Sequence, residues 1–320
     1  MTVREALTRS QNVPAVKVLT QITPSVGFSY LEKFGLSTLV STKNAINGNH
    51  DVVQSLALGG MTKGVCNIDM TAAYAAIANK GTYTKPIYYT KVLDREGNVI
   101  IDNSIPETHR VLKESSAWLL TSGMESVVNS GTATRAKLSN QPVAGKTGTT
   151  QFDTDIWFCG FTPYYTCAVW GGYDDNKECD YDTSFRFRLW KGIMSRIHEN
   201  LEEKDFKVPS SVERKSICTI TGKLAGSGCP SITEYFAKDT LPTETCSGHG
   251  YSYGSKSNSS TEDDSNSTAN TSGDSNRENG SNSTTGNTTG NTATGGDTTG
   301  GTTTGGSTGS TTGSSTGGST

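Results

Sequence analysis

The run Lys146-Thr147-Gly148-Thr149 combines residue types that could bind a carboxylate. On an extended strand the lysine ammonium would attract the anion and the two hydroxyls would bind it, while glycine would let a peptide backbone approach closely. Such a strand suits recognition of a peptide that ends in a carboxylate. The same residues also fit a plain edge strand, in which a lysine faces solvent and threonines favour the extended backbone.

A second polar group, the run SQN at 10–12, supplies a hydroxyl and an amide. Thr2 and Glu5 form a capping box, which predicts a short helix over 2–9. The next helix is expected to begin at Asn12, a favourable cap residue. Ser10 and Asn12 then lie at a junction between helices, where polar side chains can point into a cleft. The alternative is that Asn12 only caps its helix.

The lysine-bearing run belongs to the first of three expected strands, at 142–150, 155–161 and 165–173. Aromatic and β-branched residues with short turns between them predict an antiparallel meander. An amphipathic helix over 185–201 would cover one face, so the expected fold class is α+β, an antiparallel sheet flanked by helices. Further helices are expected at 24–34, 67–80 and 113–129, and a hairpin at 91–93 with 99–101.

Composition divides the chain of 320 residues into unlike parts. Residues 251–320 are mainly Ser, Thr, Asn and Gly and contain no Leu, Ile, Val, Phe or Met, which predicts a disordered, flexible tail. We expect a folded domain over 1–205 and a loop-rich, cysteine-bearing appendage over 206–250. The body is almost neutral, so no basic surface indicates nucleic acid or anionic lipid as a partner.

Neither a membrane span nor a signal peptide is recognisable. No stretch approaches the roughly 18 to 20 apolar residues that cross a bilayer, and the opening MTVREALTRSQN reads as the start of an amphipathic helix. Composition alone therefore leaves two interpretations, a cytosolic protein or part of a longer chain.

Several longer stretches extend the two motifs: LALGGMTKGV at 56–65, AAYAAIANKGTY at 72–83 and GKTGTTQFDTDIWFCGFTPYYTCAVWGGYDD at 145–175. Together they resemble the transpeptidase domain of class A penicillin-binding proteins, which belong with the serine β-lactamases to one superfamily. Its signature is Ser-x-x-Lys, then Ser-x-Asn, then Lys-Thr-Gly. The resemblance covers residues 1–205 and implies a β-lactamase/transpeptidase-like fold that is truncated at its amino terminus. The appendage resembles the segment that follows this domain in some Gram-positive members.

The resemblance implies acyl transfer on peptidoglycan. In this family a serine attacks a stem peptide ending in D-Ala-D-Ala, releases the terminal D-alanine and passes the acyl group to an amine, and β-lactams trap the acyl-enzyme. Ser10 would relay a proton toward the leaving amine, assisted by Lys146, whose pKa a neighbouring lysine would lower. Asn12 would hold the amide of the substrate.

The resemblance also assigns roles to the rest of the lysine-bearing strand. Thr147 and Thr149 would bind the terminal carboxylate, and Gly148 would let the strand align with the donor peptide. The backbone N–H of Thr149 would form half of an oxyanion hole.

One element of the signature is missing, because no serine in the sequence has lysine three positions later. Without the nucleophile, the chain alone is expected not to acylate. Two alternatives stay open: a non-catalytic module that binds stem peptides or a cell-wall partner, and a β-lactamase or β-lactam sensor. Missing upstream strands should also leave core surface uncovered, which predicts poor solubility.

The implied partners are stem peptides, β-lactams, and an upstream glycosyltransferase segment or other cell-wall synthesis proteins. The implied location is the extracytoplasmic face of the membrane or the cell wall. No cofactor is expected, and none of the four histidines is assigned a catalytic role.

Seven cysteines cannot all pair with one another. Cys159 and Cys167 could oppose each other on adjacent strands, although small apolar strand residues are the simpler interpretation. Three more cysteines in the appendage could include one disulfide. Their wide spacing does not match the usual Cys-x-x-Cys pairs of zinc sites, so no metal is expected. These three residues, with the one histidine near them, are Cys218, Cys229, Cys246 and His249.

Overall fold

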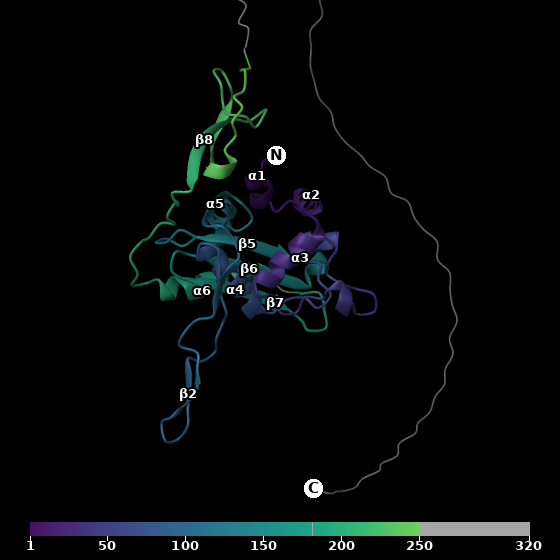
Figure 1. Cartoon of the computed structure of the whole chain (residues 1–320), viewed down its shortest axis with the longest axis vertical. Coiled ribbons are helices and arrows are strands. Elements are labelled where there is room, and N and C mark those ends of the chain that lie inside the picture. Colours follow the sequence, from purple (N-terminus) through teal and green to yellow (C-terminus); the bar gives the residue numbers. More distant parts are fainter. Residues whose placement is uncertain (181, 250–320) are drawn as a thin grey trace, which may run out of the picture. The chain divides into compact units, whose positions relative to one another are not determined.

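A three-stranded antiparallel sheet lies at the centre of the folded unit (Figure 1). The computed structural model describes residues 1–180 and 182–249. The strands β5 (Ala144–Thr149), β6 (Asp155–Phe161) and β7 (Thr166–Gly172) are neighbours in chain order, which confirms the predicted meander. β5 is an edge strand of this sheet. One sheet edge therefore carries the Lys-Thr-Gly run.

The sheet is packed on both faces, because successive side chains of a strand point to opposite sides. Phe158 contacts Phe187 and Trp190 of helix α6 (Phe185–Ile197), with ring centroids 5.4 Å and 5.1 Å away. Phe161 belongs to a cluster on the other face, beside helix α4 (Asn67–Ala78). The fold is thus α+β with helices flanking an antiparallel sheet, as predicted.

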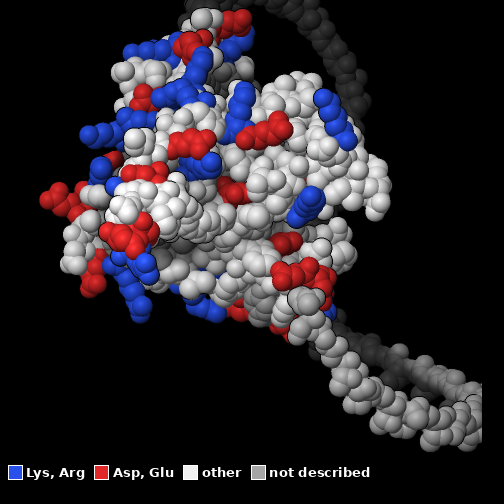
Figure 2. Space-filling model, turned by 60° about the horizontal axis from the view of Figure 1, so that its bottom comes forward, with Lys and Arg blue, Asp and Glu red and all other residues white. Residues whose placement is uncertain are grey.

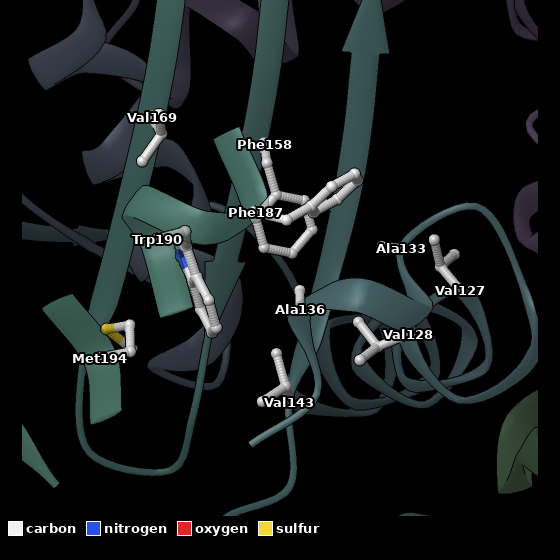
Figure 3. Packing of buried hydrophobic residues seen from close by; sticks show 10 residues of the cluster. All are labelled: Val127, Val128, Ala133, Ala136, Val143, Phe158, Val169, Phe187, Trp190 and Met194. Atoms are coloured by element: carbon white, nitrogen blue, oxygen red, sulfur yellow. The ribbon is translucent and has the colours of Figure 1, made fainter. Parts of the chain in front are cut away.

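The largest hydrophobic cluster lies between α6, the sheet and helix α5 (Glu114–Ser130), which packs along β5 (Figure 3). Phe158 and Trp190 are fully buried in it. Burial of a large apolar side chain contributes about 1.5–3 kcal/mol to the free energy of unfolding, so this cluster holds the strands in place. Its members are Val127, Val128, Ala133, Ala136, Val143, Phe158, Val169, Phe187, Trp190 and Met194.

The three amino-terminal helices follow the predicted order, with one correction. Asn12 is the first residue of its helix and the preceding Gln11 occupies the N-cap, so the side chain of Asn12 does not cap the helix. Thr2 does cap the first helix and accepts a hydrogen bond from the Glu5 N–H at 3.1 Å. The helices are α1 (Val3–Thr8), α2 (Asn12–Ile22) and α3 (Pro24–Lys33).

Three two-stranded sheets complete the described structure, and only one of them was predicted. The hairpin β2 (Lys91–Leu93) with β3 (Val99–Asp102) matches the expectation. β1 (Thr82–Thr84) pairs with β4 (Thr108–Arg110), and in the appendage β8 (Val212–Cys218) pairs with β9 (Ser231–Ala237). Short 3₁₀ turns lie at Thr42–Asn44, Gln54–Leu58, Thr134–Ala136, Gln151–Asp153 and Lys238–Thr240.

Cys159 and Cys167 do not oppose each other in the sheet. The register pairs Cys159 with Ala168 and Gly160 with Cys167, and both cysteines are free thiols. The interpretation as small apolar strand residues therefore agrees with the structure.

The surface carries both signs of charge on the face shown in Figure 2, where Lys and Arg lie beside Asp and Glu. Within residues 1–180 and 182–249, no helix is long and apolar enough to cross a membrane. The predicted disordered tail over 251–320 lies outside the described residues.

Candidate active site

Ser10 lies in a tight junction between α1 and α2. Its N–H donates to Leu7 O at 3.1 Å, and the next N–H, of Gln11, donates to Ala6 O at 2.9 Å. Ser10 has a φ of 53°, in the left-handed region that costs a residue with a side chain about 1–2 kcal/mol. Two backbone hydrogen bonds thus hold the serine in a conformation that it would not adopt freely.

The Lys146 ammonium donates a hydrogen bond to Ser10 Oγ at 2.7 Å. The two residues are 136 positions apart, so the contact exists only because the α1–α2 junction packs beside β5. Lys146 Nζ also donates to the carbonyl of Thr147 at 2.9 Å. Chemically, this is a cation held against a hydroxyl, an arrangement that can pass a proton between them.

Burial and, to a smaller extent, the nearby positive charge of Arg186 together lower the pKa of Lys146 to about 8. The pKa is therefore lowered by burial and by an arginine, in place of the neighbouring lysine that the resemblance implies. Because the amine titrates near neutral pH, it can serve as donor or acceptor under physiological conditions.

The three residues after Lys146 are held by side chains from two other elements. Thr147 Oγ1 lies 2.9 Å from Thr132 Oγ1, in the loop after α5. Arg186, in the first turn of α6, donates through Nη1 to the Gly148 carbonyl at 3.0 Å and to Thr149 Oγ1 at 2.8 Å. The strand therefore presents a second positive charge beside its hydroxyls.

A cavity of about 640 Å³ opens at this strand. It contains every residue predicted for the site, and its other walls come from α1, α2, the Gln54–Leu58 turn and α4. The walls are mainly apolar, with the polar groups gathered along β5 and at the helix junction. The predicted residues in its lining are Ser10, Asn12, Lys146, Thr147, Gly148 and Thr149.

Three residues of this region escaped prediction. Arg186 lies 37 positions from Thr149, and nothing in the FRFR run that contains it indicates a site. Thr132 follows a Ser-Gly pair at a helix end, a weak signal for a functional loop. Tyr74 lines the cavity from α4, and burial raises the pKa of its hydroxyl, so it stays neutral.

The structure also brings together four side chains that could hold a metal, Cys218, Cys229, Cys246 and His249. Their ligand atoms all lie within 4.8 Å of one another. The fold closes the gaps that the sequence spacing leaves wide, so the four side chains meet although their spacing does not match the usual zinc pairs.

Comparison with known families places two matches on the chain. The penicillin binding protein transpeptidase domain matches residues 1–186, and the penicillin-binding protein 1A, C-terminal domain matches residues 208–251. The first match spans more than half of the chain and includes all the predicted site residues.

Relatives and solved structures agree with these matches. Penicillin-binding protein 1A of Clostridium botulinum (strain Langeland) is 38% identical over 251 residues, which are 76% of this chain and 29% of that protein. Its counterpart in Clostridium tetani is 35% identical over 260 residues, 78% of this chain and 33% of that protein. The chain thus spans about a third or less of these relatives.

Two solved structures share the fold. Penicillin-binding protein 1A from Haemophilus influenzae has a TM-score of 0.64 at 23% identity and covers 77% of this chain and 41% of its own. Penicillin-binding protein PonA1 from Mycobacterium tuberculosis has a TM-score of 0.56 at 24% identity and covers 65% and 59%; it has also been solved in complex with penicillin V.

Proposed function

Because the chain belongs to the penicillin-binding protein transpeptidase domain family, we propose that it forms the part of a peptidoglycan D,D-transpeptidase site that binds the stem peptide and moves the proton. The observation that carries the proposal is the 2.7 Å contact between Lys146 Nζ and Ser10 Oγ beside the cavity. The reaction is acyl transfer: a serine ester forms as D-alanine leaves, and an amine of a second strand then takes the acyl group.

Ser10 and Lys146 provide the path for the proton. When the amide bond to the terminal D-alanine breaks, the leaving nitrogen needs a proton, which Ser10 Oγ can donate. Lys146 replaces that proton through its hydrogen bond to Ser10. Its pKa of about 8 supports this role, because an ordinary lysine would give up its proton less readily near neutral pH.

The β5 strand and α6 provide the charge that binds the carboxylate. Thr147 and Thr149 offer hydroxyl donors, and Arg186 adds a guanidinium at Thr149 Oγ1. Arginine pairs with carboxylates through two parallel N–H donors, which would orient the end of the peptide. Arg186 is thus an addition to the site assigned from the sequence.

The remaining roles concern alignment of the peptide. β5 is an edge strand, so a bound peptide can lie along it as a further strand, and Gly148 would let the strand align with the donor peptide. The Thr149 N–H would stabilise the developing oxyanion. Asn12, in the lining of the same cavity, would hold the substrate amide.

The chain itself supplies no Ser-x-x-Lys, so we propose that alone it binds stem peptides reversibly and forms no acyl-enzyme. We place it at the extracytoplasmic face of the membrane or in the cell wall, with a glycosyltransferase segment or other cell-wall synthesis proteins as partners. The division of the chain into a domain over 1–205, an appendage over 206–250 and a tail over 251–320 is part of the same proposal.

Two measurements on the purified full chain test the proposal. Calorimetry should show saturable binding of a peptide that ends in D-Ala-D-Ala. Lys146→Met should lower the affinity for this peptide roughly 10- to 100-fold, the usual cost of losing a hydrogen bond to a charged group. Lys137→Met, at an exposed lysine, is the matched control. Equal binding by the peptide with an amidated terminus would contradict recognition of the carboxylate.

Fluorescent penicillin distinguishes the alternatives. We expect no covalent band and no hydrolysis of a chromogenic cephalosporin. Covalent labelling would show that the chain holds a nucleophile of its own, and hydrolysis would favour a β-lactamase. Peptide binding without either reaction supports the proposal.

A further inference from the structure

The cysteine-bearing appendage contains a compact group of four ligand atoms contributed by three separate segments. Cys218 ends β8, Cys229 lies just before β9, and Cys246 and His249 follow β9. His249 Nε2 lies 3.1 Å from Cys218 Sγ and 3.3 Å from Cys246 Sγ. All four ligand atoms are within 4.8 Å of one another, so the side chains converge on one point.

The backbone around the cluster is built to bring these segments together. The Thr219 N–H donates to Pro230 O at 2.9 Å, which joins the residue after Cys218 to the residue after Cys229. The Cys246 N–H donates to Leu224 O at 2.8 Å. Three hydrogen-bonded segments thus meet at the sulfurs.

Two glycines allow the chain to pass close to the ligands. A Cβ at Gly226 would lie 2.1 Å from the carbonyl oxygen of Cys246, so only glycine fits. Gly248, directly before His249, has a φ of 98°, which residues with side chains rarely adopt. The close approach and the sharp turn both serve to place ligands.

The cluster is partly shielded from solvent. Cys218 and Cys246 are buried, and Cys229 and His249 are half-buried. Such shielding suits a structural metal, which keeps no open position for water or substrate.

We propose that Cys218, Cys229, Cys246 and His249 bind one Zn²⁺ ion in a tetrahedral structural site. Three thiolates and one imidazole form a closed Cys₃His set, which is typical of structural zinc. A zinc ion with sulfur at about 2.3 Å separates its sulfur ligands by about 3.8 Å, within the spacing observed here. On binding, each of the three thiols loses its proton to solvent, and neutral His249 donates its Nε2 lone pair.

Zinc would meet a stability requirement of the appendage. An isolated two-stranded sheet is marginal in water, and units of about 40 residues or fewer usually need a metal, a disulfide or a partner. The appendage buries little apolar surface: Val212, Ile217 and Ala237 are its buried apolar residues besides cysteine. Cys218 and Cys246 are the other buried members, and both are ligands.

The site is also connected to the body of the protein. Arg4 in α1 donates to Glu234 of β9 at 2.8 Å and to the Ser122 carbonyl of α5 at 2.7 Å. Trp118 of α5 packs edge-on against Tyr235 of β9, with ring centroids 4.5 Å apart. Zinc would therefore stabilise β9, the strand that α1 and α5 contact.

The test is zinc content and coordination of the full chain purified in the presence of reductant and Zn²⁺. We expect about one zinc per chain, and X-ray absorption should show three sulfurs at about 2.3 Å and one nitrogen at about 2.0 Å. A chelator should remove the zinc and expose three more thiols to a thiol reagent.

Ligand variants separate coordination from folding. Cys229→Ser and His249→Gln should reduce bound zinc at least tenfold, whereas His249→Cys should retain it with four sulfurs, because Cys₄ is also a zinc ligand set. Cys66→Ser and His109→Gln, at exposed residues outside the cluster, are the matched controls. Absence of zinc from the wild-type chain, a disulfide within the trio under these conditions, or equal losses in the control variants would overturn the proposal.

Discussion

The Lys-Thr-Gly strand and the cysteine cluster place their polar groups by different physical means. Lys146 meets Ser10 across 136 residues because both elements rest on a large hydrophobic core. The four proposed zinc ligands lie within residues 218–249, in and around a two-stranded sheet with few buried apolar residues. The first site is positioned by a hydrophobic core. At the second, a bound zinc ion would supply the stabilisation that a core otherwise gives.

The largest expected effect is the loss of structure in the appendage when zinc is removed. Structural zinc contributes roughly 10 kcal/mol or more to small domains, so chelation or Cys246→Ser should abolish amide protection in β8 and β9. β5, β6 and β7 should keep their protection. Hydrogen exchange followed by mass spectrometry measures both regions at once, and equal loss in the central sheet would remove the distinction between them.

The converse experiment destabilises the core and leaves the metal. Trp190→Ala removes a fully buried side chain that contacts Phe158 and should lower the free energy of unfolding by about 3–5 kcal/mol. Leu189→Ala, at an exposed neighbour on α6, should change it by less than about 0.5 kcal/mol. Denaturant unfolding measures the change, and zinc content should stay the same in both variants.

Peptide binding at the Lys-Thr-Gly strand should depend on pH, because Lys146 titrates there. Lys146 has a folded-state pKa of about 8 against an ordinary 10.5, so affinity for a peptide carboxylate should fall as pH rises through 8 and the ammonium is lost. Between pH 8 and 10.5 the unfolded chain binds more protons at Lys146, so this residue makes stability rise with pH. Calorimetry at pH 7 and 9.5 measures the first effect, and denaturation of wild type and Lys146→Met measures the second. A pH-independent difference between the two proteins would contradict the assignment.

The smallest effect concerns the geometry of one arginine. Arg186→Lys keeps the charge but loses the planar set of donors that reaches Gly148 and Thr149, so peptide affinity should fall roughly fivefold, about 1 kcal/mol. Arg188→Lys, at an exposed arginine paired with Asp182, should leave affinity unchanged. Similar losses in both variants would indicate a general effect of charge geometry on α6.

The sequence predicts the strand that carries Lys-Thr-Gly and its place in the meander, because these signals are local or belong to a family pattern. Aromatic and β-branched runs define the meander, and Lys-Thr-Gly marks the strand. The contacts of Arg186 with Gly148 and Thr149 could not be predicted, since they depend on how α6 packs against the sheet.

The appendage was harder to predict for a related reason. β8, with the sequence VERKSIC, has few apolar residues and lacks a clear alternating pattern, so it resembles a loop. The four proposed ligands are separated by gaps that only the closed fold brings together. Neither the strand nor the cluster is visible until the partner segments are in place.

The Arg4 contact has a practical consequence for choosing domain boundaries. A chain cut after residue 205 would correspond to the folded domain expected from the sequence, yet it would leave the Arg4 guanidinium without the Glu234 carboxylate. The same cut would expose the face of Trp118 that now contacts Tyr235. Expressing the two family segments separately would therefore leave an exposed aromatic ring and an unpaired positive charge next to α1, the helix that precedes Ser10. The two segments are better produced as one chain.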